Sequence, residues 1–472
     1  MRAKSESFDR LWFVGFAGHR AVPDRQGAKS AISRELEILR DTVSGELVGI
    51  SSAAAGADLL FLEACRDAGM KTVILLPFPE SRFAEDFDDP HEWERARQAI
   101  ADAWWHEVAP GGEDAPAAYH VVARQCLEIA DRMLFLWDGK PARGLGGTAE
   151  SVNEAERIDM PSRIIDATDF SARWNGRIPS GPEHDPQFDD LPSAACVGEL
   201  FEKLDQRAVA GAPRSRWFAA GSMSLNHFAT ILQAILVAFA FAADEVGAML
   251  KLVIVTIAAS LPWIGGRLRW QQRWVNDRVK AELLRSLLAC HEPNSPLRPW
   301  ALELFANEEA FLRTSALRLI HMRKGWEQAR DEYLGSRLEN QIRYLRSKGE
   351  KAAKRMRVFG NLFRISSWCA VGLGAFLVIS AFLNLPFAPP VQTGLSFTAA
   401  VMPGIAAWCL AMISVFEFKR RSSLYRQLVE ELERLRPKIA GASCASEVSR
   451  AMSQIERLLL NEVWEWQGSR GK

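Results

Sequence analysis

Residues 144–150, with the sequence GLGGTAE, combine residue types that bind a phosphate or a ribose. Glycines let backbone amides approach a ligand closely, Thr148 can donate a hydroxyl, and Glu150 can accept a bond from a sugar hydroxyl or a base edge. The segment follows the apolar run Met133–Trp137, and a helix that begins near Ala149 would point its positive end at an anion. The alternative is an ordinary glycine-rich loop between a strand and a helix.

Two further loops follow apolar runs in the same way. Leu11–Phe16 leads into Ala17-Gly18-His19-Arg20, which places two basic side chains in a loop. Val48–Ile50 leads into a run of small residues that ends at Asp58. In an open α/β sheet such loops meet at the carboxyl ends of the strands, where ligands bind. The sequence therefore predicts one site formed by three loops.

Each of these side chains also has a purely structural explanation. His19 could cap or fill a turn, and Arg20 could pair with Asp24 on the surface, where an ion pair contributes little stability. Asp58 stands where a helix would begin and could be its N-cap. These alternatives stay open at the level of sequence.

Residues 11–167 alternate between short apolar runs and amphipathic segments. This pattern is typical of a Rossmann-like, doubly wound α/β fold with a parallel sheet. Trp104 and Trp105 end one predicted helix and could stack on a base, although core or interface positions are more typical. Further strands are expected at Lys71–Pro77 and Arg163–Asp166, and helices at residues 28–43, 59–68, 91–106, 116–130 and 149–159.

The Gly-His-Arg at 18–20, the Ala-Gly-Ala-Asp at 55–58 and the Gly-Gly-Thr-Ala-Glu at 146–150 resemble the SLOG family. This Rossmann-like group includes the Lonely-guy cytokinin-activating hydrolases, DprA-like proteins and nucleotide-derivative sensors of bacterial antiphage systems. The resemblance covers about a third of the chain and implies that a cyclic nucleotide or an NAD-derived nucleotide binds, with no further cofactor. The ligand-binding residues that it implies are Gly18, His19, Arg20, Ser52, Gly56, Ala57, Asp58, Gly146, Gly147, Thr148 and Glu150.

The last motif departs from that of the hydrolases in this group. Their motif resembles Pro-Gly-Gly-x-Gly-Thr-x-x-Glu, whereas this chain lacks the preceding proline and the second downstream acid. The resemblance therefore favours a sensor domain without catalytic residues over an enzyme.

Hydrophobic residues make up 48% of the 472 residues, an ordinary average that hides a strong segregation. Four apolar segments are long enough to cross a bilayer as helices, namely Ser224–Ala243, Val246–Ile264, Ser366–Leu385 and Gly394–Phe416. We expect an all-α membrane domain with four transmembrane helices and long cytoplasmic helices after the α/β domain. The expected parts are a sensing domain (1–170), a linker and juxtamembrane segment (171–222), two transmembrane hairpins (223–265 and 366–416), and cytoplasmic helices (266–365 and 417–472).

Charge predicts the orientation of these spans. Lysines and arginines precede the first and third spans and follow the second and fourth, whereas the two hairpin loops contain none. By the positive-inside rule both hairpins extend outward across a bacterial inner membrane, and both terminal regions lie on its cytoplasmic side. Trp217, Trp263 and Trp368 stand at span ends, as in aromatic belts.

Several polar residues lie within the spans. Lys251, a few residues into the second span, could snorkel to the outer surface or face an aqueous path. Small and weakly polar residues could line an opened pore, or could simply allow helices to pack closely. The candidates for pore lining are Gln233, Thr256, Ser260, Ser380, Thr398 and Ser414.

Each predicted hairpin is followed by a basic turn and an amphipathic helix, Trp274–Leu288 and Leu424–Pro437, which indicates a duplicated unit. Residues 300–359 between them are expected to form long helices. Their segment 333–348, YLGSRLENQIRYLRSK, resembles the SLATT group of helical membrane effectors, over roughly residues 300–430. Such modules occur beside SLOG domains in bacterial defence clusters and are thought to breach the inner membrane. A plain coiled-coil spacer is the alternative.

Three functions fit this order of parts. The favoured one is a membrane effector in which a nucleotide second messenger rearranges a homo-oligomer and permeabilises the membrane. The others are a membrane-tethered hydrolase of nucleotide derivatives and a non-catalytic scaffold. The seven cysteines are scattered and indicate neither a metal site nor a disulfide framework. The expected partners are the nucleotide, membrane lipid and further copies of the chain, and no nucleic acid is expected.

Overall fold

The computed structural model describes residues 8–112, 114–141, 146–211, 214–238, 245–267, 270–291, 294–385 and 387–468. It divides into two compact units. Unit 1 comprises residues Met1–Leu200 and Asn294–Arg323, and unit 2 comprises Phe201–Pro293 and Lys324–Lys472.

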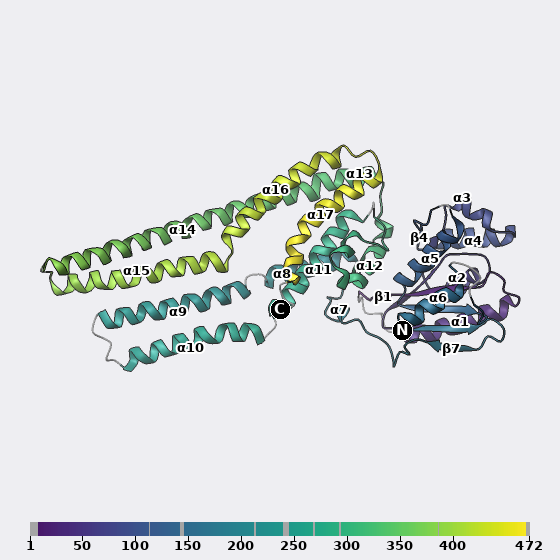
Figure 1. Ribbon diagram of the computed structural model, residues 1–472, viewed down its shortest axis with the longest axis horizontal. Helices are drawn as coiled ribbons and strands as arrows, with labels where there is room; N and C mark the ends of the chain where they lie inside the picture. The colour runs from purple at the N-terminus through teal and green to yellow at the C-terminus, as the bar shows by residue number, and fades with distance from the viewer. Residues whose placement is uncertain are drawn as a thin grey trace. The chain divides into compact units, whose positions relative to one another are not determined.

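Unit 1 is built on a seven-stranded sheet in the order β4-β3-β2-β1-β5-β6-β7 (Figure 1). Every neighbouring pair is parallel except β6 and β7. The prediction of a largely parallel, Rossmann-like α/β fold at the N-terminus is therefore confirmed. The strands are β1 (Leu11–Gly18), β2 (Glu46–Ser51), β3 (Thr72–Leu76), β4 (Trp105–Val108), β5 (Arg132–Trp137), β6 (Ser162–Asp166) and β7 (Ala172–Asn175).

Helices cover both faces of this sheet because its strands are apolar on both sides. Trp12, Val14 and Phe16 of β1 pack into one core together with α1 and α2, whereas Leu11 and Phe13 pack into a second core with α5 and α6. Such two-sided burial is typical of parallel sheets. The helices are α1 (Arg25–Asp41), α2 (Ala57–Asp67), α3 (Glu80–Phe83), α4 (Pro90–Asp102), α5 (Ala115–Ile129) and α6 (Thr148–Arg157).

Two elements differ from the sequence prediction. The helix expected over 91–106 ends at Asp102, and Trp105 begins the edge strand β4 instead. Residues 172–175, expected within a linker, form the antiparallel strand β7.

The chain after β7 packs onto unit 1. Arg132, almost fully buried at the start of β5, pairs with Glu183 at 2.7 Å, and Arg10 pairs with Asp185 at 3.0 Å, just before the short helix α7 (Pro186–Asp189). The returning segment 294–323 carries α12 (Glu309–Arg318), whose Thr314 hydroxyl accepts a hydrogen bond from the Leu11 backbone N–H at 3.1 Å. The N-terminal unit is thus completed by residues from the middle of the chain.

Unit 2 is helical. Its helices are α8 (Val197–Gly211, which begins in unit 1), α9 (Arg214–Ala238), α10 (Glu245–Arg267), α11 (Trp270–Cys290), α13 (Trp326–Glu332), α14 (Glu339–Phe382), α15 (Pro389–Val415), α16 (Phe418–Ala440) and α17 (Ala445–Gly468). A π-helical stretch, Tyr333–Leu338, joins α13 to α14, so that one helix runs from Trp326 to Phe382. The expected amphipathic helices after the two hairpins correspond to parts of α11 and α16.

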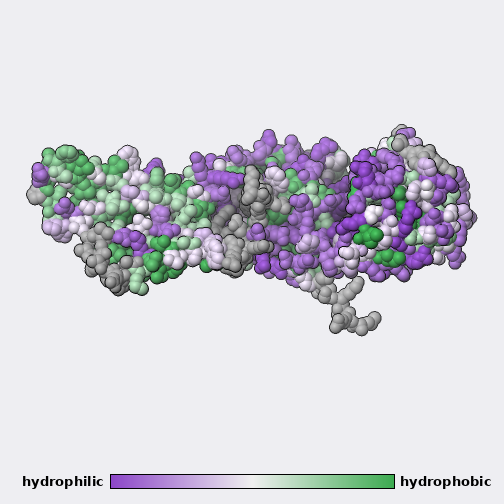
Figure 2. All heavy atoms as spheres, turned by 60° about the horizontal axis from the view of Figure 1, so that its bottom comes forward, coloured by the Kyte–Doolittle hydropathy of each residue, from purple (hydrophilic) through white to green (hydrophobic). Residues whose placement is uncertain are grey.

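Two long helical segments among the described residues, Trp326–Phe382 and Pro389–Ala440, contain a stretch long and apolar enough to cross a membrane. The expectation of four such spans is met only in part, because among the described residues α10 adds only the apolar stretch Met249–Ile264 and α9 is not a further candidate. Figure 2 shows hydrophobic side chains concentrated at the end of unit 2 that α9, α10, α14 and α15 form. Trp368 and Phe382 are 73% and 83% exposed there, which an aqueous surface would disfavour.

The polar end of unit 2 has its own core. Tyr333, Leu338, Ile342 and Leu345 pack there against apolar residues of α16 and α17, so one face of the segment 333–348 is a packing surface. Glu417, with φ +51°, lies between α15 and α16. The two helices can therefore run against α14 as separate segments.

Candidate ligand-binding site

The candidate site lies where the strand order of unit 1 reverses. β1 pairs with β2 on one side and with β5 on the other, and Gly18 at its end lies opposite Leu136 of β5. The loops after β1 and β5 leave this point toward opposite faces of the sheet, and ligands of open α/β sheets bind at such points. All three loops singled out from the sequence follow strands at this edge.

His19 connects the ends of the two central strands. Its Nε2 accepts a hydrogen bond from the Asp138 backbone N–H at 3.0 Å and lies 3.1 Å from Oδ1 of Asp138. Nε2 accepts in the first contact when it carries no proton and donates in the second when it carries one, because one nitrogen cannot accept and donate at once. The backbone N–H of Lys140 is the main cause that lowers the pKa of Asp138, so this carboxylate stays charged beside the imidazole.

Glycines allow the loops after β1 and β2 to approach each other. Gly56 has φ +88°, and a Cβ there would lie 2.0 Å from the Arg20 carbonyl oxygen. A Cβ on Gly18 would lie 2.5 Å from the Cβ of Ala57, whose backbone N–H donates to the His19 carbonyl at 3.1 Å. These residues thus hold the two loops together through their backbone.

Asp58 is not an N-cap, because Gly56 holds that position in α2. Its buried carboxylate accepts hydrogen bonds from the hydroxyls of Ser51 at 3.0 Å and Ser52 at 2.5 Å. Burial raises the pKa of Asp58 despite these hydrogen bonds. Asp58 and Ser52 therefore fasten the β2–α2 loop instead of presenting free polar groups to a ligand.

Arg20 is the exposed cation of the site. Its guanidinium carbon lies 4.9 Å from the ring centroid of Tyr119 in α5, and it makes no ion pair among the residues that the structure describes. The alternative pairing with Asp24 does not occur, since Asp24 caps α1 through the Gly27 N–H. A cation that stacks on an aromatic ring and lacks a carboxylate partner is suited to bind an anion.

Tyr119 is held in place from the other side. Its hydroxyl donates to Oδ2 of Asp86 at 2.8 Å, and Arg82 pairs with Oδ1 of the same carboxylate at 3.1 Å. Burial raises the pKa of the Tyr119 phenol, an effect that Arg20 opposes and Asp86 strengthens. The phenol therefore stays neutral at physiological pH and fixes the ring beneath Arg20.

The glycine-rich loop reaches the same helix α5. Gly146 has φ +77°, and a Cβ there would lie 2.8 Å from the His120 backbone nitrogen. Its N–H donates to Oε2 of Glu150 at 2.7 Å, and Oε1 of Glu150 lies 3.3 Å from Nδ1 of His120. Gly147 is the N-cap of α6, and half-buried Thr148 begins this helix. Residues 142–145 lie outside the described residues.

Tyr119 and His120 therefore link the two halves of the site, since one lies under Arg20 and the other against Gly146. These two residues, and also Asp138 and Asp86, were not predicted from the sequence. Asp138 carries a signal that could have been used, because it directly follows an apolar strand, as the Gly-His-Arg motif does. Tyr119 and His120 carry none, because their role depends on where α5 packs.

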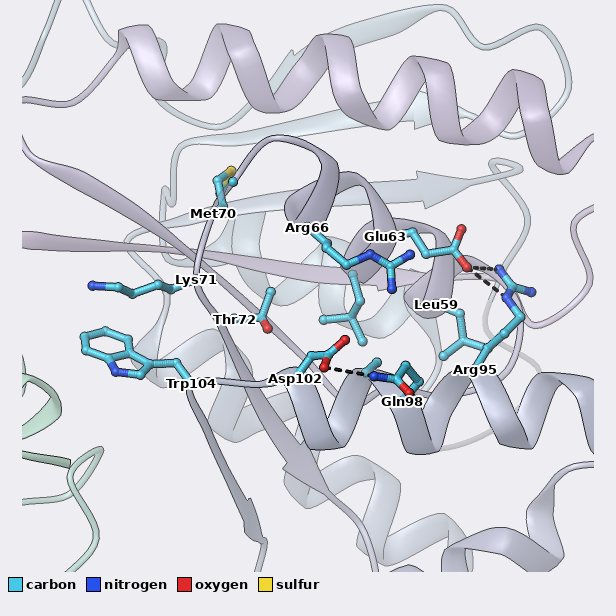
Figure 3. Close-up of a pocket in the computed structure, with 13 residues that line it drawn as sticks. Leu59, Glu63, Arg66, Met70, Lys71, Thr72, Arg95, Gln98, Asp102 and Trp104 are labelled. Carbon is cyan, nitrogen blue, oxygen red and sulfur yellow. Dashed lines mark hydrogen bonds and ion pairs between the residues drawn. The ribbon is translucent and has the colours of Figure 1, made fainter. Parts of the chain in front are cut away.

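A separate cavity of about 480 Å³ lies at the other end of β3, between α2 and α4 (Figure 3). Two of its charged residues, Glu63 and Arg95, pair with each other, and Lys71 pairs with Glu46 outside the cavity. Trp104 lines this cavity and is covered by the Lys71 ammonium 4.1 Å from its ring. Trp104 and Trp105 pack at the edge of the core, so base stacking at the carboxyl edge is not their role.

The candidate pore residues behave in two ways. The hydroxyls of Thr256, Ser260, Ser380 and Thr398 donate to carbonyls of their own helices at 2.8–2.9 Å. Such hydroxyls need no aqueous path, and Ser414 is simply exposed. Gln233 differs, because it lines a cavity shared by three helices.

Comparison with known proteins assigns no family to this arrangement. No protein-family model matches the chain, and no curated protein matches it significantly in sequence. The chemistry of the site must therefore follow from its own residues, and the SLOG and SLATT resemblances stay predictions.

Proposed function

We propose that this protein is a ligand-gated membrane effector. A nucleotide or NAD-derived second messenger binds at the carboxyl edge of the sheet in unit 1, and the membrane helices of unit 2 respond. The observation that carries this proposal is Arg20, an exposed guanidinium without an ion pair among the described residues, at the switch point of a Rossmann-like sheet.

The ligand class follows from the groups around Arg20. The guanidinium and the amino end of α6 both attract a phosphate. The partly exposed carboxylate of Glu150 retains acceptor capacity for a ribose hydroxyl or a base edge beyond its bond to Gly146. An anion with sugar and base attached, such as a cyclic nucleotide or an NAD derivative, uses all three features.

A sensor is favoured over a hydrolase. The carboxylate of Asp58 is buried and accepts hydrogen bonds from the hydroxyls of Ser51 and Ser52, so it is not free to activate water. The departure from the hydrolase motif points the same way.

The membrane part of the proposal uses four helices in two hairpins, α9 with α10 and α14 with α15. All four lie in one bundle, since α9 packs against both α10 and α15 and α15 packs against α14. Basic residues flank the ends opposite the hairpin loops, which supports terminal regions in the cytoplasm of a bacterium. Several protomers are needed for a pore, because four helices enclose no wide channel.

Signal transfer has a covalent route. The chain passes between the units three times, at residues 200–201, 293–294 and 323–324. The last passage leads directly into the helix Trp326–Phe382, which carries the first long apolar stretch. A ligand that binds one conformation of unit 1 more tightly than another by a few kcal/mol can therefore favour one packing of the unit 2 helices. In a bacterial defence setting the result would be depolarisation and growth arrest of the host.

Binding tests the sensor. Arg20→Ala should weaken binding of the cognate ligand roughly ten- to hundredfold, because a hydrogen bond to a charged group contributes about 1.5–3 kcal/mol. Calorimetry of the full chain with a panel of cyclic nucleotides and NAD-derived cyclic products provides the measurement. Arg97→Ala, which removes an exposed arginine of α4, is the matched control and should bind normally. Equal affinity for both variants would place the ligand elsewhere.

Dye-loaded liposomes test the effector. The ligand found by calorimetry should release dye from liposomes that contain the full chain, and Arg20→Ala should require a higher ligand concentration. Turnover of the ligand without dye release would replace the effector with a hydrolase.

A further inference from the structure

A groove of about 870 Å³ lies among the apolar helices of unit 2. In Figure 1, α9 lies between α10 and α15, and residues of all three line the groove. One group of lining residues is polar, led by Gln233, Lys251 and Gln392. The other group, which includes Ala229, Val255, Phe397 and Ala400, is apolar.

The polar side chains of the groove differ in whether other groups of the protein form hydrogen bonds or ion pairs with them. The hydroxyls of Thr230 and Thr393 donate to carbonyls of their own helices at 3.0 Å. The side chains of Gln233, Lys251 and Gln392 have no hydrogen-bond or ion-pair partner among the residues that the structure describes. An ammonium and two amides beside lipid are costly unless a further molecule supplies partners. Their convergence on one groove therefore points to a ligand with an anionic, hydrogen-bonding group.

The depth of these residues defines the shape of that ligand. Gln233, Lys251 and Gln392 all lie within two helical turns of the hairpin ends, which are Ala238, Glu245 and Pro389. Ala229, Val255, Phe397 and Ala400 lie more than two turns from those ends, toward the middle of the helices; the amide of Asn226 is an exception at that level. A charged head beside Lys251 and an apolar tail along the deeper wall would fill the groove.

We propose that this groove binds an anionic phospholipid of the leaflet at the hairpin ends. Lys251 contacts the headgroup phosphate, Gln233 and Gln392 donate hydrogen bonds to the headgroup oxygens, and an acyl chain lies along the apolar wall. This proposal rests on the membrane location of α9, α10 and α15 put forward above, and is independent of the nucleotide site.

Lipid retention tests the proposal. The full chain is reconstituted in nanodiscs with equal parts of phosphatidylglycerol and phosphatidylcholine, and the lipids that stay bound after release are counted by native mass spectrometry. Wild-type protein should retain phosphatidylglycerol in preference to phosphatidylcholine. Lys251→Gln should reduce that preference about fivefold, the effect expected for one lysine beside an anionic bilayer. Lys251→Arg should keep it.

Two further variants separate the groove from general effects. Lys351→Gln removes an exposed lysine of α14 outside the groove and should leave the preference unchanged. Ala400→Trp fills the apolar wall and should reduce retention while Lys251 is intact. Failure of either expectation would contradict the assigned site.

Three further outcomes would contradict the lipid site or the proposed membrane function. Equal retention by wild type and Lys251→Gln in correctly inserted protein would overturn the lipid site alone. Displacement of phosphatidylglycerol by inorganic phosphate would assign the groove to a free anion instead. Failure of the wild-type chain to insert in nanodiscs would contradict the proposed membrane function itself.

Discussion

Gly56 shows how a single residue holds the candidate site together. Gly56→Ala should destabilise unit 1 by about 1–3 kcal/mol or more, because the residue has φ +88° and its Cβ would collide with the Arg20 carbonyl. The same substitution should weaken ligand binding, since relief of the collision must move the loop that carries Arg20. Thermal melting of the full chain in detergent and calorimetry with the cognate ligand measure the two effects.

Gly69→Ala is the matched control for this prediction. Gly69 has φ +64° but no atom within 4 Å of its Cβ position, so only the backbone strain of about 1 kcal/mol should appear. Equal losses in the two variants would show that the close contact with Arg20 contributes nothing.

The residues of the site were predictable only where the sequence order encodes them. A motif directly after an apolar run must lie at the carboxyl edge of a parallel sheet, which is why His19 and Gly146 were found. The contact partners Tyr119 and His120 lie inside α5, and their place depends on helix packing. Asp58 lies at the end of the predicted loop after β2, but its carboxylate accepts hydrogen bonds from Ser51 and Ser52 and so stabilises this loop.

At the scale of elements, the strands with clear apolar runs were predicted correctly, whereas the short edge strands β4 and β7 were not predicted. β1, β2, β3, β5 and β6 are buried and bounded by turn residues, so their apolar runs stand out. β4 has alternating partial exposure and follows α4 with only two residues between, so Trp104 and Trp105 were included in the expected helix. β7 lies in a segment rich in glycine, proline and aspartate, and becomes a strand only because β6 offers a free edge.

The place of residues 294–323 also depends on tertiary packing that the sequence pattern does not reveal. Residues 294–323 were expected to continue the cytoplasmic helices, yet Leu297 and Leu317 complete a core of unit 1. Apolar periodicity shows that a helix has a buried face. It does not show which part of the molecule covers that face.

The π-helical stretch Tyr333–Leu338 carries a buried ion pair whose loss should destabilise unit 2. Arg337 binds both carboxylate oxygens of the fully buried Glu456 at 2.8 and 2.9 Å, and the Tyr333 hydroxyl donates to the same carboxylate at 2.8 Å. Glu456→Gln should cost about 3–5 kcal/mol, because it leaves the Arg337 guanidinium buried beside a neutral group. Thermal melting of the full chain in detergent should show a fall of several degrees.

The exposed pair Arg346–Glu433 serves as the comparison, with an N–O distance of 2.6 Å and side chains about half exposed. Glu433→Gln should change stability by less than about 1 kcal/mol. The double variant Arg337→Met with Glu456→Leu should regain part of the loss, since two apolar groups replace two charges while the Tyr333 hydroxyl still loses its acceptor. No difference between Glu456→Gln and Glu433→Gln would contradict the role assigned to the buried pair.

At the scale of the whole molecule, the sequence overstated how clearly all four spans would appear. Trp326–Phe382 and Pro389–Ala440 meet the length and hydropathy of a membrane helix, whereas α10 carries Lys251 in its apolar stretch. α9 contains Asn226, His227 and Gln233, which lower its hydropathy. Gln233 and Lys251 line the groove to which an anionic lipid is proposed to bind, so that proposal accounts for polar residues within these two helices.

The orientation of the chain can be tested with one introduced cysteine and one native cysteine. Ala388→Cys lies in the turn before α15, at the expected outer surface, and should react with an impermeant maleimide on intact cells. Cys444, exposed in the turn before α17, should react only after lysis. The hydrogen bond from Ser446 is the main cause that lowers the pKa of Cys444, so a larger share of this thiol is reactive thiolate at neutral pH. Its protection in intact cells would therefore reflect the membrane barrier and not poor intrinsic reactivity.

Replacement of the other exposed cysteines, Cys196 and Cys369, by serine keeps the labelling specific for the two test positions. Labelling of Cys444 in intact cells, with Ala388→Cys labelled only after lysis, would invert the topology and place unit 1 outside, where a cytoplasmic second messenger could not reach Arg20.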